Sequence, residues 1–172
     1  MRWTHDPDNL VPSTVTDPFA LLREFPDEHA VQTRPDVLTF STEPRRRPLD
    51  LAGPVRLRVH VGSAAASMHL HAKLADVAPD GTAHMLVRGQ AHVPDPDPGG
   101  AVEISLGHSG YRLQSGRRLR VHLACSDYPL YIWHPGTGEN PWHATAGKRN
   151  EQTLVTGGTA PSHLSITVLG DA

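Results

Sequence analysis

Two histidines separated by one residue are the first candidates for chemistry in this chain. A β-strand projects His69 and His71 from the same face, as a strand-borne metal site requires, and Asp76 follows as a possible carboxylate ligand. No third histidine or glutamate stands at a suitable spacing, and Lys73 on the same face would repel a cation. We therefore predict no metal and no other cofactor.

The histidines of the predicted strands, these two included, also fit a structural interpretation. In alternating strands they take the polar positions that point away from the core. The positions concerned are His60, His69, His71, His122 and His163.

A serine between glycines suggests a catalytic nucleophile. Residues 107–111 read Gly-His-Ser-Gly-Tyr, and an exposed nucleophile turn requires glycines around Ser109 and a helix after it. Tyr111 stands where glycine is needed, and Gln114 and Ser115 lead through a turn into a strand. We interpret the segment as a loop at a sheet edge and predict that the chain has no hydrolytic activity of its own, because it lacks a nucleophile, base and carboxylate set.

One loop has the composition of a ligand-binding surface. Residues 131–143 are rich in glycine and proline and carry two Trp-His pairs, Trp133 with His134 and Trp142 with His143. Such side chains can stack on a sugar or an aromatic group. They can equally anchor a long loop to its own sandwich or to a neighbouring domain, so both interpretations stay open.

Composition excludes several kinds of partner. The 172 residues suit one domain, and the formal net charge of −2 gives no electrostatic reason to expect nucleic acid or an acidic membrane. Cys125 is the single cysteine, which excludes an intrachain disulfide, and its place in an alternating strand predicts burial. The amino terminus lacks a signal-peptide pattern and no apolar run is long enough to cross a membrane, so we expect a cytoplasmic protein.

Apolar residues alternate with polar ones along most of the chain. From Val55 to Val61 and from Met68 to Leu74 every second residue is apolar, which is typical of strands buried on one face. Strands are predicted at residues 36–40, 55–61, 68–74, 83–92, 101–107, 117–125, 151–156 and 162–169. Strands at this spacing predict an all-β sandwich of two packed antiparallel sheets.

The first residues follow a different pattern. They are rich in proline, and one short helix is predicted over residues 18–24, with Asp17 as its cap and Pro18 as its first helical residue, ending before Pro26. We expect a single domain, 1–172, in which residues 1–35 form an extended arm that wraps a sandwich of residues 36–170.

Several motifs, in this order, resemble one known family. They are Asp-Pro-Asp-Asn-Leu-Val-Pro-Ser at 6–13, Arg-Pro-Asp-Val-Leu-Thr-Phe at 34–40, Gly-Pro-Val at 53–55, Ala-Lys-Leu-Ala-Asp-Val at 72–77, Pro-Asp-Gly at 79–81, the turn, strand and Ser-Asp-Tyr-Pro corner of 114–129, and Pro-Ser-His-Leu at 161–164. This series is similar to the C-terminal domain of the Xaa-Pro dipeptidyl-peptidase and cocaine-esterase type of hydrolase.

The resemblance implies a galactose-binding-like jelly roll that packs on an α/β-hydrolase domain, and that domain carries the catalytic Ser, Asp and His. In esterase-like members the segment after Val-Pro-Ser helps to line the acyl pocket. Its nearest counterparts here are Phe19, Leu21 and Leu22, although the Gly-Gly that follows this motif in the family is absent.

Three functions stay open. The chain is an accessory domain of a hydrolase, a free-standing module for a carbohydrate or small ligand, or a structural domain that associates with itself. We expect a hydrolase catalytic domain or chain as partner, with homo-oligomers where that partner is absent.

Overall fold

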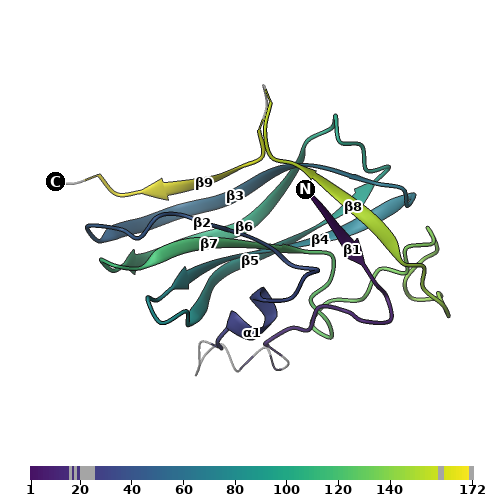
Figure 1. The fold of residues 1–172 in the computed structure, drawn as a ribbon, viewed down its shortest axis with the longest axis horizontal. Coiled ribbons are helices and arrows are strands. Elements are labelled where there is room, and N and C mark those ends of the chain that lie inside the picture. Colours follow the sequence, from purple (N-terminus) through teal and green to yellow (C-terminus); the bar gives the residue numbers. More distant parts are fainter. Residues whose placement is uncertain (16, 18, 20–25, 159–160, 171–172) are drawn as a thin grey trace.

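The computed structural model describes residues 1–15, 17, 19, 26–158 and 161–170 as two antiparallel sheets packed face to face (Figure 1). One sheet has the order β1 (Arg2–His5), β8 (Asn150–Val155), β3 (Leu49–Ser63) and β6 (Val102–Leu113), and β9 (His163–Val168) also pairs with β3. The other has the order β2 (Leu38–Ser41), β7 (Arg118–Ala124), β4 (Ser67–Val77) and β5 (Ala83–Pro94). The predicted all-β sandwich is confirmed.

The core lies between the two sheets because alternate residues of each strand point inward. Val55, Val59 and Val61 from β3 meet Leu70 and Leu74 from β4, and all five are almost fully buried. Burying each such side chain stabilises the fold by roughly 1.5 to 3 kcal/mol. Cys125 is also buried in this core, as predicted.

Strand β4 differs from its prediction. It was expected to be buried on one face, but every residue from Leu70 to Val77 is buried. The second face is covered by the amino-terminal arm and by the loop after β7, which contribute Glu28 and Asp127 to contacts with Lys73. The alternation therefore identified the core face correctly and could not show that the other face is covered.

The loop predicted around Ser109 is a strand. Residues 107–111 belong to β6, at the edge of its sheet, where Ser109 lies opposite Gly53 and is buried. A β-bulge interrupts the pairing, since the register passes from Val55 opposite Gly107 to Arg56 opposite Ser105. Gly107 takes a φ of 90°, a conformation that favours glycine, so the glycine serves the bulge and not a nucleophile turn.

The arm contains β1 at its start and α1 (His29–Gln32) near its end, and neither was predicted. The helix predicted over residues 18–24 falls outside the described residues except for Phe19. Phe19 is described, and its backbone N–H donates to the Asp17 carboxylate at 2.9 Å. Among the described residues, no helix is long and apolar enough to span a membrane.

Candidate docking arm and its buried anchor

Two points of the described arm are fixed to the sandwich. Before the gap in the described residues, the Ser13 N–H donates to the Tyr128 carbonyl at 2.7 Å. After it, the Glu28 N–H donates to the Ala83 carbonyl at 2.8 Å. The Thr14 hydroxyl donates to the Glu28 carboxylate, so the two points are also joined to each other. We call residues 16–26, between these points, the arm tip.

A buried ion network holds the base of the arm. The Lys73 Nζ lies 3.0 Å from Glu28 Oε2 and 3.0 Å from Asp127 Oδ1, and the three side chains are at most 3% exposed. The network joins the arm, β4 and the loop after β7. Charges so deeply buried persist only when they are paired, so the three elements must be placed together.

The arm tip carries an apolar side chain into solvent. Phe19 is 68% exposed. Leu21 and Leu22 lie outside the described residues, so of the three predicted pocket residues the structure places Phe19 alone. Tyr128, which pairs with Pro12 at the base of the arm, is 46% exposed. An exposed aromatic side chain on an anchored loop is suited to contact a partner.

Asp76, the predicted carboxylate ligand, is used elsewhere. It accepts a hydrogen bond from the Tyr111 hydroxyl at 2.5 Å and one from Arg117 Nε at 2.6 Å. Burial, and then this hydrogen bond, raises the pKa of Tyr111 to about 12. The cluster is structural, since it ties β4 to β6 and to the residue before β7.

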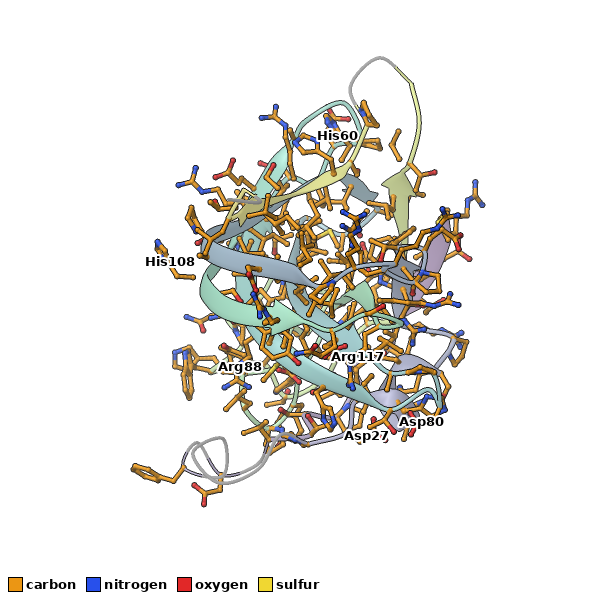
Figure 2. The ribbon with its side chains drawn as sticks, turned by 90° about the vertical axis from the view of Figure 1, so that its left-hand side faces the viewer. Asp27, His60, Asp80, Arg88, His108 and Arg117 are labelled. Atoms are coloured by element: carbon orange, nitrogen blue, oxygen red, sulfur yellow. The ribbon has the colours of Figure 1, made fainter. Side chains whose placement is uncertain are left out.

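The five histidines predicted to point away from the core differ in exposure. His60, His71 and His122 are less than 10% exposed, His69 is half-buried and His163 is exposed. A position on the outer side of a strand therefore does not mean contact with solvent in this fold. Figure 2 shows His60 at the opposite end of the molecule from Asp27 and Asp80.

The loop with the two Trp-His pairs does not present them as one exposed surface. His134 is 3% exposed, and Trp133 is half-buried near Gly147. Trp142, in contrast, is 80% exposed, and His143 is exposed. The first pair anchors the loop to the sandwich, and the second remains available to a ligand.

Three histidines, one of them from this loop, converge where the loop meets the sheet. His69 of β4, His92 of β5 and His134 of the loop bring one ring nitrogen each within 4.8 Å of the others. Sequence analysis identified His69 but not His92, and it concluded that no third histidine was available. That conclusion is wrong for His69, because His92 and His134 lie beside it. The argument from the charge of Lys73 is weakened too, because Glu28 and Asp127 balance that charge.

The chain matches the X-Pro dipeptidyl-peptidase C-terminal non-catalytic domain over residues 2–165. It belongs to that family.

Three proteins similar to this chain are much longer than it. Cocaine esterase from Rhodococcus sp. (strain MB1 Bresler) is 32% identical over 124 residues, which cover 65% of this chain and 21% of the esterase. An α-amino acid ester hydrolase structure is 25% identical with a TM-score of 0.85, over 98% of this chain and 32% of the hydrolase. An aminopeptidase from a marine sediment Thaumarchaeota archaeon, 23% identical over 99% of this chain and 33% of its own, shares the fold with a TM-score of 0.86. The chain thus spans a fifth to a third of the length of these relatives.

Proposed function

We propose that this chain is an accessory domain that docks on an α/β-hydrolase catalytic domain and helps to shape its acyl pocket. One observation carries the proposal: the chain matches a non-catalytic domain family over almost its whole length, and it corresponds to a minor part of each related hydrolase. The catalytic Ser, Asp and His then belong to the partner.

The arm tip is the contact that we propose. Its base is fixed by the buried Glu28–Lys73–Asp127 network, while Phe19 at the tip is exposed. A fixed base limits the conformational entropy that docking would otherwise cost. Covering Phe19, Leu21 and Leu22 with the partner would contribute roughly 1.5 to 3 kcal/mol for each side chain.

The test is co-expression of this domain with an α/β-hydrolase catalytic domain supplied as a separate chain. We expect the Phe19→Ser, Leu22→Ser double variant to sediment separately from the hydrolase, and the hydrolase's esterase activity to fall when the wild-type domain is replaced by the variant. The domain alone should show no saturable ester or Xaa-Pro hydrolysis that depends on Ser109, which is buried in β6.

A matched control uses Leu169, which is 59% exposed beyond β9. Leu169→Ser removes a similar apolar surface far along the chain from the arm tip, so the complex should persist. The proposal fails if wild-type domain neither binds the hydrolase nor changes its activity, or if the Leu169 variant dissociates as readily as the double variant.

A ligand-binding module is the second candidate, because Trp142 is 80% exposed in a loop rich in glycine and proline. That candidate predicts saturable binding of a mono- or oligosaccharide that quenches tryptophan fluorescence. The signal should disappear in Trp142→Ala and persist in the double variant of the arm tip.

A further inference from the structure

His69 and His92 form a cross-strand pair on the outer face of the four-stranded sheet. They lie directly opposite each other in the antiparallel β4–β5 register, and their ring centroids are 5.4 Å apart. Met68 and Leu70, the neighbours of His69 along the strand, point into the core, so the two imidazoles point away from it. Side chains paired in this way lie close enough to share one ligand.

His134 completes a group of three from the loop above the sheet. Its ring centroid lies 4.7 Å from that of His69 and 6.3 Å from that of His92. The ring is held in place because its Nδ1 accepts a hydrogen bond from the Gly136 N–H at 3.0 Å, and its Nε2 lies 3.0 Å from the Ser67 hydroxyl. The loop therefore presents this imidazole to the pair on the strands.

The donor set determines the kind of ligand. Three imidazoles, without a thiolate or carboxylate in the group, suit zinc and the neighbouring divalent transition metals and do not suit calcium or magnesium. Three histidines also form a known zinc arrangement in which the fourth position is left to water or another ligand. We propose that His69, His92 and His134 bind one divalent transition-metal ion.

Two of the three rings lie in surroundings that hold little water. Burial, and then the neighbouring histidines, lowers the pKa of His69 and of His134 to about 4. A hydrogen bond to the backbone of Ile132 also orients the His69 ring, as partners outside the metal shell commonly do.

Binding requires a small rearrangement. Zn–N bonds of about 2.1 Å in a tetrahedral site place the nitrogens about 3.4 Å apart, and the three nitrogens here all lie within 4.8 Å of one another. Both ring nitrogens of His134 are in hydrogen bonds, so this ring must give up one of them to bind the ion. His92 is exposed, so it can move without disturbing the core. The ion would fasten the loop of residues 131–149 to the β4–β5 hairpin.

The experiment uses the full chain without a histidine tag, titrated with zinc at pH 7 by calorimetry and with cobalt(II) by visible absorption. We expect one equivalent of zinc, a tetrahedral cobalt spectrum and a melting temperature that rises with zinc. In His92→Ala the zinc affinity should fall by at least about tenfold, since losing a partner outside the shell already costs 10- to 100-fold. His92 is exposed, so this variant should keep the far-ultraviolet circular dichroism of the wild type.

His108 provides the matched control. It is exposed on β6 of the opposite sheet and projects away from the molecule in Figure 2. His108→Ala should bind zinc as the wild type does. The proposal is overturned if no stoichiometric zinc binds, if His92→Ala binds zinc unchanged, or if His108→Ala loses as much affinity as His92→Ala.

Discussion

His122 shows how strongly the environment of one side chain is altered when the outer face of a sheet is covered. It is 1% exposed, and its Nδ1 has no hydrogen-bond partner among the described residues. Burial, and then the charge of Lys73 and the ring of His71, lowers the pKa of His122 to about 3. Lys73 is also its partner across the β4–β7 pairing. The imidazole is therefore buried in its neutral form.

This burial predicts a specific loss of stability in acid. The unfolded chain protonates His122 near pH 6.5 and the folded chain only near pH 3, so the unfolded state binds more protons between these values. The free energy of unfolding should fall as the pH is lowered through this window, by about 1.4 kcal/mol for each unit of pKa difference. Urea unfolding at pH 7 and pH 4.5 should show a smaller decrease for His122→Leu than for the wild type.

The exposed His108 again supplies the comparison. His108→Leu should retain the whole pH dependence of the wild type. Equal pH dependence in the wild type and in His122→Leu would show that His122 is not held neutral in the folded state.

At the scale of elements, one lysine connects the arm to the sandwich. Lys73→Met removes the cation and leaves Glu28 and Asp127 buried without a counter-charge. Breaking a buried ion pair in this way costs about 3 to 5 kcal/mol. Urea unfolding at pH 7 should detect the loss, and limited proteolysis should cut the arm sooner than in the wild type.

The exposed Arg56–Glu103 pair on neighbouring strands serves as the control for Lys73→Met. Its charged atoms are 3.9 Å apart, and both side chains are more than half exposed. Arg56→Met should hardly change stability, because exposed ion pairs contribute little. If Lys73→Met were as stable as the wild type, the network would not anchor the arm.

Strand positions could be predicted from sequence more readily than their pairing. Alternation located the strands of the core, but β1 has only four residues and was missed within the arm. Pairing could not be derived because a bulge after Leu74 shifts the β4–β5 register by one residue. Without this shift His69 would oppose Ala91, which points to the other face of the sheet. His92 therefore gave no signal in the sequence.

The candidate site was predictable only where family motifs reached it. The motif at 6–13 drew attention to the arm, and Phe19 is exposed there, while the roles of Phe19, Leu21 and Leu22 stay predictions. Glu28 carried no signal, and Asp127 was noticed only as part of the Ser-Asp-Tyr-Pro corner. The role of neither could be predicted, because the contact of each with Lys73 joins segments far apart in the chain. His134 was identified as a loop residue, but its burial depends on how the loop folds back on β4.

At the scale of the whole molecule, the two sides of the sandwich differ. On one side the edge strands of the two sheets, β5 and β6, approach closely at Gly89 and Ser105. On the other side an apolar cavity of about 310 Å³ opens between the sheets, with Phe40, Leu57 and Leu164 among its lining residues. Contact between the sheets is thus close at the β5–β6 side, and the fold should tolerate added volume poorly there.

Gly89→Ala tests this directly. A Cβ at position 89 would lie 2.0 Å from the Ser105 carbonyl oxygen, a backbone atom that cannot rotate away, so the sheets must separate locally. Overpacking of this kind costs about 1 to 3 kcal/mol.

Gly110→Ala is the matched control, because it adds the same methyl group to β6, where no other atom lies within 4 Å. Thermal and urea unfolding should show a clear loss of stability for Gly89→Ala and almost none for Gly110→Ala. Equal stabilities would mean that the β5–β6 contact is loose and that the sandwich is held together chiefly by the core residues of β3 and β4.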